Sequence, residues 1–483
     1  FKIFADINVF DIEIDEKDPD KFIEIVKGIA PTFGGINLED IKAPEAFYIE
    51  QRLKEELNIP LMHDDQHGTA IISAAALINA LEISGKKIDE VKMVVNGAGA
   101  AAIACTKLYI ALGLKKENVL MCDSKGVINH KRQNLTPEKI DFIANTDIET
   151  LEDALKGADV FVGLSKGNVM SAEMLQSMAE NPVVFALANP TPEIDYNLAV
   201  SVREDVLMAT GRSDFPNQVN NVLGFPYIFR GALDVQASGI NEEMKLAAVH
   251  AIADLAKEAV PEMVKLAYNV KNLNFGREYF IPKPFDNRLL TKVSIAVAKA
   301  AIESGIAGKP ISDFEAYENQ LLDRMGRDEK LIRMMQNRAR SNPKRVVLGN
   351  AEEYNVLKAA QILYEEGIAH PILLGEKKYV KEQMEKFDIH LDVPIVDPAD
   401  DDQEENRRKY RKTLWELRNR KGVNEYIAKR LVRQRDYFAP LMLKHGDTDA
   451  LIVGYSKNYR TVLKPILEII EKEKGVDRVA AMM

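Results

Sequence analysis

The chain has 483 residues, of which 46% are hydrophobic and 29% are charged, which is the composition of a globular protein with room for two or more domains. Its 64 basic and 74 acidic residues give a net charge of −10, which argues against nucleic acid or an anionic membrane as the main partner. Two cysteines cannot form a disulfide framework, and no apolar run reaches the length of a membrane span, so we expect a cytoplasmic protein.

The first part of the chain predicts alternating strands and helices. We expect strands over residues 10–14, 36–38 and 59–62, and helices over 18–27 and 44–57. This order is typical of βαβ units with a parallel sheet.

Acidic residues follow the second and third of these strands. Glu39 and Asp40 come after one strand, and Asp64 and Asp65 come after the other, ahead of a helix expected to begin near Thr69. Neighbouring parallel strands end at the same edge of a sheet, where α/β proteins bind ligands. Three or four carboxylates there suit a hard cation, Mg²⁺ or Mn²⁺. The alternative is an aspartate N-cap with an acidic neighbour, which the helix dipole also favours.

A glycine-rich turn follows the next predicted strand, residues 91–95. It reads Asn96-Gly97-Ala98-Gly99-Ala100-Ala101-Ala102, a GxGxxA pattern that opens a helix. Gly97 permits the tight turn, and Gly99 lets a pyrophosphate approach the backbone. The pattern predicts a Rossmann-type dinucleotide site.

Asp123 ends the following strand, about 20 residues beyond this turn, where such folds place the acid that binds the ribose. An acid alone favours NAD. Ser124 and Lys125 come next, with Lys131 and Arg132 nearby, and hydroxyl and cationic groups accommodate the 2′-phosphate of NADP. The sequence therefore favours NADP and leaves NAD open, and the cations could instead belong to a solvated basic loop.

Three more strands are expected over residues 160–163, 183–188 and 206–209. Asn189 follows the second of them, and the Asn220-Asn221 pair follows the third. Uncharged donors and acceptors at this edge suit a substrate carboxylate or carboxamide, although asparagine is also an ordinary turn former.

The remainder of the chain predicts a linker and a second domain. One long amphipathic helix is expected over residues 242–268, and a charged helical segment continues to about 340. A second parallel unit begins with strands over 345–348 and 371–374. Near its end, the run Tyr455-Ser456-Lys457-Asn458-Tyr459-Arg460 opens a helix and suits an anionic ligand.

Residues 1 to about 300 closely resemble the bacterial malic enzymes, through INLEDI, HDDQHGTA, VVNGAGAAA, ANPTPEI and NNVLGFPYIFRGALD. From about residue 329 the chain is similar to the N-terminal part of phosphotransacetylases, through VLKAAQIL, HPILLG and GDTDALIVGYSKNYRTVLKP. This order resembles the two-domain hybrid malic enzymes. It implies an α/β chain made of the end of a malic N-terminal domain (1–66), a Rossmann-type NAD(P)-binding domain (67–300), a helical linker (301–328) and an incomplete phosphotransacetylase-like domain (329–483).

The resemblance also implies roles for single residues. It makes Glu39, Asp40 and Asp65 the metal ligands and places Asp64 beside the acid/base machinery. It implies that Thr69 and Ala98 to Ala101 contact the dinucleotide, and that Asn189, Asn220 and Asn221 meet substrate or nicotinamide. The lysine base and tyrosine acid of the family are expected upstream of Phe1, and we expect truncation at both ends.

The activity that the resemblance implies is oxidative decarboxylation of (S)-malate to pyruvate and CO₂, with reduction of NADP⁺ or NAD⁺. Acetyl-CoA is expected as an effector acting through the second domain, and a homo-oligomer is expected. Two alternatives remain open: a phosphate acetyltransferase with a regulatory first domain, and a metabolite-sensing protein that only binds. This segment by itself is expected to bind dinucleotide without turning over malate.

Overall fold

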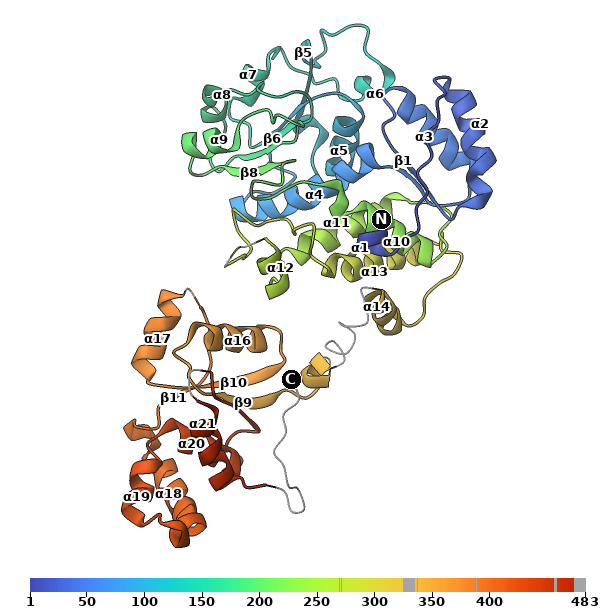
Figure 1. Ribbon diagram of the computed structural model, residues 1–483. Helices are drawn as coiled ribbons and strands as arrows, with labels where there is room; N and C mark the ends of the chain where they lie inside the picture. Colours follow the sequence, from blue (N-terminus) through green and yellow to red (C-terminus); the bar gives the residue numbers. More distant parts are fainter. Residues whose placement is uncertain are drawn as a thin grey trace. The chain divides into compact units, whose positions relative to one another are not determined.

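The computed structural model describes residues 1–268, 270, 272–324, 335–336, 338–387, 389–455 and 458–472. The chain divides into two compact units, residues 1–326 and 327–483 (Figure 1). Both are layered α/β folds, which confirms the predicted fold class.

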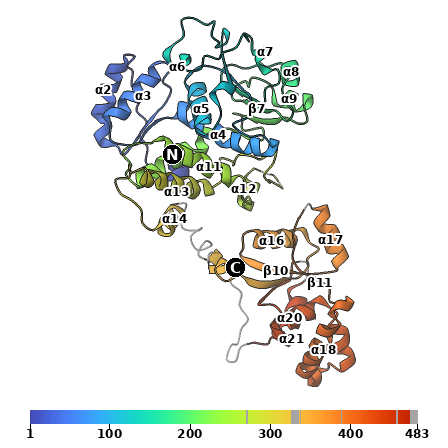
Figure 2. The same cartoon turned by 180° about the vertical axis from the view of Figure 1, so that it is seen from behind.

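The first unit begins with a small two-stranded sheet. Its elements are α1 (Lys2–Ala5), α2 (Pro19–Ile29), β1 (Ile36–Leu38), α3 (Glu45–Glu56) and β2 (Leu61–His63). The two strands pair in parallel, with Leu38 beside His63. Helices α2 and α3 pack side by side (Figures 1 and 2). Their apolar side chains form one hydrophobic cluster with those of the two strands. The ends of the two strands are therefore fixed side by side.

A six-stranded sheet forms the centre of the unit. Its strands are β3 (Met93–Asn96), β4 (Val119–Asp123), β5 (Gly126–Val127), β6 (Val160–Gly163), β7 (Val183–Ala186) and β8 (Leu207–Thr210). Their order is β5-β4-β3-β6-β7-β8, and all pairs are parallel except the β4–β5 hairpin. The strand order reverses between β3 and β6, and such a switch point is where doubly wound folds bind dinucleotides.

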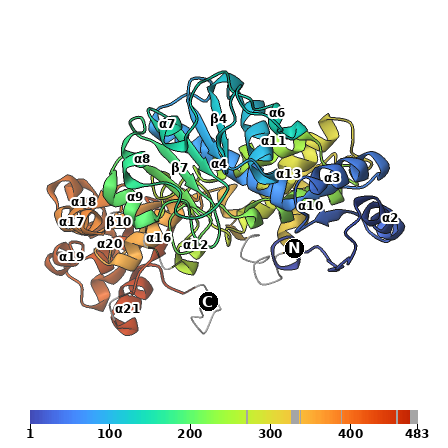
Figure 3. The same cartoon turned by 90° about the horizontal axis from the view of Figure 1, so that it is seen from above.

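Helices cover both faces of this sheet. One face carries α4 (Asp64–Ser84), α5 (Ala100–Ala111), α10 (Phe225–Asp234), α11 (Glu242–Leu255) and α13 (Arg288–Glu303), and the other carries α7 (Leu151–Leu155), α8 (Ala172–Gln176) and α9 (Tyr196–Val202) (Figure 3). Along β3, Val95 packs into the first layer and Val94 into the second, because alternate strand residues face opposite sides. Further short helices are α6 (Pro137–Ile140), α12 (Glu262–Ala267) and α14 (Phe314–Asp323).

Helix α4 lies in the layer formed with α5, α10, α11 and α13. Alone among the described helices it has the length and apolar composition of a membrane span, and 67% of its most apolar window is buried within the fold. It packs against α5 and α11. Its composition is that of a helix surrounded by protein on all sides.

Three sequence predictions for this unit are wrong. The segment 10–14 forms no strand, and Phe10 is 73% exposed, because its alternating pattern has no partner strand to pair with. The long helix over 242–268 is interrupted: α11 ends at Leu255, and α12 begins at Glu262, directly after Pro261, which lacks a backbone donor and disfavours helix in the residue before it. The helix expected near Thr69 begins five residues earlier, at Asp64.

The second unit is a four-stranded parallel sheet, in the order β11-β10-β9-β12, with helices on both faces. Its elements are β9 (Lys344–Leu348), α16 (Tyr354–Glu365), β10 (Ala369–Leu374), α17 (Lys377–Lys386), β11 (Ile395–Val396), α18 (Glu404–Arg418), α19 (Glu425–Leu431), α20 (Arg435–His445), β12 (Ala450–Ile452) and α21 (Tyr459–Ile469). The predicted parallel unit is confirmed. Ser456 and Lys457 of the predicted anion-binding run, and residues 325–334 of the predicted helical segment, lie outside the described residues.

Candidate active site

Four carboxylates meet where β1 and β2 end. The pairing of the two strands confirms the predicted shared edge, and the backbone N–H of Asp40 donates to Oδ2 of Asp65 at 3.1 Å. Asp40 adopts a left-handed backbone conformation with φ 56°, which aspartate tolerates in turns. Because β1 and β2 pair in parallel up to Leu38 and His63, the turn after β1 and the start of α4 lie in direct contact.

Burial makes Asp64 a proton-binding group near neutral pH. Its side chain is buried, and this burial raises its pKa to about 7, while the hydrogen bond from Asn221 opposes the shift and the charges of Glu39 and Asp65 add to it. The pKa of Glu39 is also raised, first by burial and then by the charge of Asp65. Asp64 can therefore hold or release a proton under physiological conditions.

A residue distant in the sequence orients Asp64. Asn221 donates through Nδ2 to Oδ2 of Asp64 at 3.0 Å, and Thr69 donates through Oγ1 to Oδ1 of Asn221 at 3.1 Å. Oδ1 of Asp64 is buried without a hydrogen-bond partner among the described residues. Gly68 makes room for it, since a Cβ at that position would lie 2.1 Å from Oδ1. Thr69 and Asn221, predicted as ligand contacts, are thus brought together on Asp64.

The predicted metal ligands are neighbours, but their side chains do not surround a common point. Within the described residues, no group of three or more His, Cys, Asp or Glu side chains is arranged to hold a metal ion. The Glu39 carboxylate accepts a hydrogen bond from Asn37 Nδ2 at 2.7 Å, and Asp40 reaches Asp65 through its backbone. The donor set nevertheless fits a hard cation, because its oxygens repel one another and a cation relieves that repulsion.

A buried ionic network supports the beginning of α4. Glu50 on α3 accepts the backbone N–H of His63 at 3.1 Å and bonds His67 Nε2 at 2.9 Å. Lys245 on α11 bonds the other nitrogen of His67 at 3.2 Å. Burial, followed by the charge of Lys245, lowers the pKa of His67 to about 4, so its ring is neutral at pH 7. Glu50 was not predicted at the site, because its local sequence indicates only an ion pair with Lys54 one helical turn later.

The glycine-rich turn after β3 has the geometry that its sequence predicts. Gly97 has φ 136°, and a Cβ there would lie 2.5 Å from the carbonyl oxygen of Leu164 at the end of β6. Helix α5 begins at Ala100 after Gly99, and no side chain caps its first turn. The unused N–H groups of such a turn are a ready site for a phosphate.

Asp123 is held by two cations at the tip of the β4–β5 hairpin. Arg132 donates to both carboxylate oxygens at 3.0 and 2.9 Å, and Lys139 donates at 3.2 Å. Burial raises the pKa of Asp123, but the hydrogen bonds from Arg132, the Lys125 N–H and Lys139 bring it down to about 2. Lys139 was not predicted, because nothing in the sequence around α6 relates it to Asp123.

The remaining predicted residues lie at the same edge of the large sheet. Asn189 is exposed just beyond β7. Asn220 acts as a turn former, since its Oδ1 accepts the backbone N–H of Val222 at 3.0 Å. The side chain of Asn189 is therefore accessible to a ligand. The side-chain oxygen of Asn220 is already used within the turn.

Comparison with known proteins gives the family. The model described as "Malic enzyme, NAD binding domain" matches residues 66–275, and that described as "Malic enzyme, N-terminal domain" matches residues 10–54. An NADP-dependent malic enzyme of Halomonas elongata is 58% identical over 64% of this chain and 74% of that protein. The chain belongs to the malic enzyme family.

Other malic enzymes extend this relationship. The crystal structure of the malic enzyme from Pyrococcus horikoshii Ot3 covers 70% of this chain and 76% of its own, with 38% sequence identity and a TM-score of 0.62. The NADP-dependent malic enzyme of Escherichia coli is 48% identical over 100% of this chain. This chain spans 64% of that relative's length.

The second unit of this malic enzyme family member matches another model. Residues 330–483 match "Phosphate acetyl/butaryl transferase". The predicted resemblance to a malic enzyme joined to a phosphotransacetylase-like domain is confirmed.

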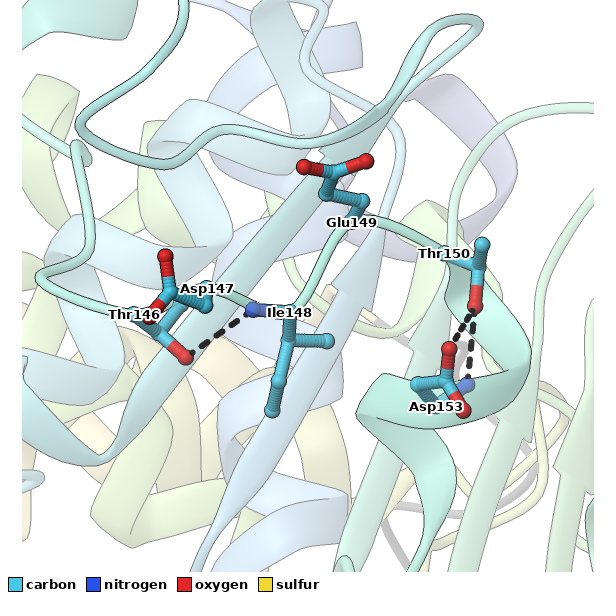
Figure 4. A pocket seen from close by; sticks show the side chains of 6 residues that line it. All are labelled: Thr146, Asp147, Ile148, Glu149, Thr150 and Asp153. Atoms are coloured by element: carbon cyan, nitrogen blue, oxygen red, sulfur yellow. Dashed lines mark hydrogen bonds between the residues drawn. The ribbon is translucent and has the colours of Figure 1, made fainter.

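A surface hollow elsewhere in the malic unit contains none of the candidate residues. It has a volume of about 540 Å³ and is lined by Thr146, Asp147, Ile148, Glu149, Thr150 and Asp153 (Figure 4). Lys131 forms ion pairs with Asp147 and Glu149 at 3.1 and 3.0 Å. The lining of this hollow is mainly acidic and disfavours an anionic ligand.

Proposed function

We propose that this chain is the malate- and dinucleotide-binding part of an NADP-dependent malic enzyme, which oxidatively decarboxylates (S)-malate to pyruvate and CO₂. The observation that carries the proposal is Asp64. This carboxyl, with a pKa of about 7, is oriented by Asn221 inside a cluster of carboxylates, in the same unit as the dinucleotide turn. The names of the relatives support the reaction.

Glu39, Asp40 and Asp65 would hold the divalent cation, Mg²⁺ or Mn²⁺. When bound, the cation supplies positive charge that draws electrons from the substrate during decarboxylation, and the nicotinamide accepts a hydride. Turning the Glu39 side chain away from Asn37 frees it to act as a ligand.

The protein's own groups orient the substrate and handle protons. Asp64 receives or gives a proton at its buried Oδ1, and Asn221 keeps the other oxygen in place. Asn189, exposed beyond β7, supplies an amide to a substrate carboxylate or to the nicotinamide carboxamide. Burial of Asp64 excludes water from the proton that it carries.

NADP is the proposed cofactor, with NAD as the alternative. Because both oxygens of Asp123 already accept hydrogen bonds from cations, a ribose hydroxyl would have to compete with Arg132 and Lys139 for them. A 2′-phosphate would instead be attracted by the positive charges of Arg132 and Lys139, which outnumber the negative charge of Asp123.

The second unit is proposed to bind acetyl-CoA as an effector, on the strength of its match to an acyltransferase family model. A phosphate acetyltransferase activity is the alternative from another enzyme class. Formation of acetyl phosphate from acetyl-CoA and phosphate by this chain would favour that alternative, whereas acetyl-CoA binding without it supports the effector role.

The proposal is tested by titrating the chain with NADP⁺ and with L-malate in the presence of Mn²⁺; this segment by itself is not expected to form reduced nicotinamide. We expect NADP⁺ to bind in micromolar to millimolar concentrations, and Mn²⁺ to tighten malate binding. The Glu39→Gln variant should lose the effect of Mn²⁺ on malate and keep NADP⁺ binding. Malate binding that is unchanged by Mn²⁺ and by this substitution would refute the metal role and favour a sensor that only binds.

A further inference from the structure

Glu193 is a buried carboxylate that takes no part in the chemistry described above. It lies in the loop after β7, and its side chain is 0% exposed. Its Oε1 accepts the backbone N–H of Ser165 at 3.0 Å, and its Oε2 accepts the backbone N–H of Ala188 at 3.0 Å. One side chain therefore joins the segments that follow two neighbouring strands, β6 and β7.

The surrounding backbone leaves space for this carboxylate. A Cβ on Gly163, the last residue of β6, would lie 2.3 Å from Cδ of Glu193. Burial raises the pKa of Glu193, while the N–H groups of Ser165 and Ala188 act against this shift. Burying a carboxyl is costly unless hydrogen bonds compensate, and here two backbone N–H groups supply them.

The hydrogen bonds of Glu193 continue to the dinucleotide turn. Oγ of Ser165 accepts a hydrogen bond from Asn96 Nδ2 at 2.8 Å, and Asn96 immediately precedes Gly97. On the other side, Ala188 immediately precedes Asn189, the exposed asparagine beyond β7. The contacts thus link the ends of β3, β6 and β7 at the switch point of the sheet.

We propose that Glu193 is a positioning residue that holds Ser165 and Asn189 in place for the nicotinamide half of the dinucleotide. This inference rests on the proposed dinucleotide binding. In a doubly wound fold each half of the sheet takes one nucleotide of the pair. The glycine turn and Asp123 belong to β3 and β4, so the adenine half lies there, and the loops joined by Glu193 belong to the other half.

The Glu193→Gln variant tests this by calorimetric titration of the whole chain with NADP⁺ and with 2′,5′-ADP, which is the adenine half alone. Glutamine presents an NH₂ to one of the two N–H donors, so one loop loses its hydrogen bond. We expect the dissociation constant of NADP⁺ to rise about tenfold, and that of 2′,5′-ADP to change less than twofold. Glu180→Gln, the same change at an exposed glutamate of the same unit, should alter neither.

Gly163→Ala is the second variant, because its methyl group displaces the carboxylate without changing it, and we expect the same selective loss. The thermal midpoint of each variant shows whether it is folded. If both variants weaken NADP⁺ and 2′,5′-ADP equally, or neither, the positioning role is refuted and the proposed function stands. If the unaltered chain binds neither compound, both proposals fall.

Discussion

Asp64 shows why neighbouring residues in the sequence do not reveal their chemistry. Asp64 and Asp65 are adjacent in the sequence, yet the side chain of Asp64 is buried under Asn221, while that of Asp65 is 47% exposed. Burial is the largest cause of the raised pKa of Asp64, and the charges of Glu39 and Asp65 add to it. The sequence predicted both residues at a site, and the packing of α4 and η3 (Asn221–Leu223) gives them different environments.

The raised pKa of Asp64 predicts a pH-dependent stability in the metal-free chain. Its pKa is about 7 when folded and about 3.9 when unfolded, so between these values the folded state binds more protons. Stability contributed by this group is therefore present below pH 4 and is lost as pH rises to 7. Asp64→Asn should remove this slope, worth at most on the order of 4 kcal/mol across the window. Urea unfolding in EDTA at several pH values measures it.

The control for this experiment is Asp141→Asn, the same change at an exposed aspartate. Its unfolding free energy should keep the slope of the unaltered chain. A slope in Asp64→Asn as steep as that of the unaltered chain would show that other groups, such as Glu39 and Glu193, carry it.

The second prediction for a single residue concerns Arg132. It donates to both oxygens of Asp123, and its removal leaves that acid with the Lys139 side chain and the backbone N–H of Lys125 as donors. We expect Arg132→Ala to weaken the binding of 2′,5′-ADP by about ten- to a hundredfold, because a charged hydrogen bond to the 2′-phosphate is lost. Binding of 5′-ADP, which lacks that phosphate, should change little or improve, as Asp123 becomes available to the ribose hydroxyl. Equal losses for both nucleotides would place the 2′-phosphate elsewhere.

Hydrogen bonds between residues far apart in the sequence could not be predicted, although Asn221 itself was predicted at the site. Glu193 reaches Ser165, and Asn221 reaches Asp64, 28 and 157 positions away. Hydrophobic periodicity and turn-forming residues indicate a single helix, strand or turn, and do not show which elements lie next to one another. Such residues become visible only when the strand order is known.

At the scale of elements, a strand is predicted correctly where all of its residues are buried, and wrongly where its formation depends on a neighbouring strand that is absent. The strand predicted over residues 160–163 coincides with β6, whose four residues are all buried. The segment 10–14 shows a strand pattern with no strand beside it. The helix predicted over 242–268 keeps its apolar spacing across Pro261, so the spacing concealed the break that proline signals.

The start of α11 gives a prediction for a single element. Oδ1 of Asn241 accepts the N–H of Met244 at 3.0 Å, and its Nδ2 donates to Oγ of Ser304 at 2.8 Å, which ties α11 to the end of α13. Asn241→Ala should lower the free energy of unfolding by about 2 kcal/mol, since both the cap and this link are lost. Asn241→Asp keeps the cap and should lose about half as much. Equal losses of unfolding free energy in the two variants would mean that only the hydrogen bond to Ser304 matters.

At the scale of the whole molecule, the chain contains separate hydrophobic cores. Every core cluster among the described residues belongs to one unit, either within residues 1–321 or within 346–470. The order of elements in the sequence was sufficient to predict two α/β units. It could not show that β1 and β2 form a small sheet of their own, because strand pairing depends on how the helices pack.

Separate cores predict separate unfolding transitions. Because each unit buries its own apolar residues, scanning calorimetry of the whole chain should show two unfolding transitions. NADP⁺ should raise the midpoint temperature of the transition that belongs to residues 1–326 and leave the other unchanged. At a hundred times its dissociation constant, the ligand adds about 2.7 kcal/mol to the unit that binds it, which is a shift of several degrees. A chain of residues 1–326 should show that transition alone, with the same response. A single transition that NADP⁺ moves as a whole would mean that the two units unfold cooperatively, and that the cores are thermodynamically coupled although they share no buried residue.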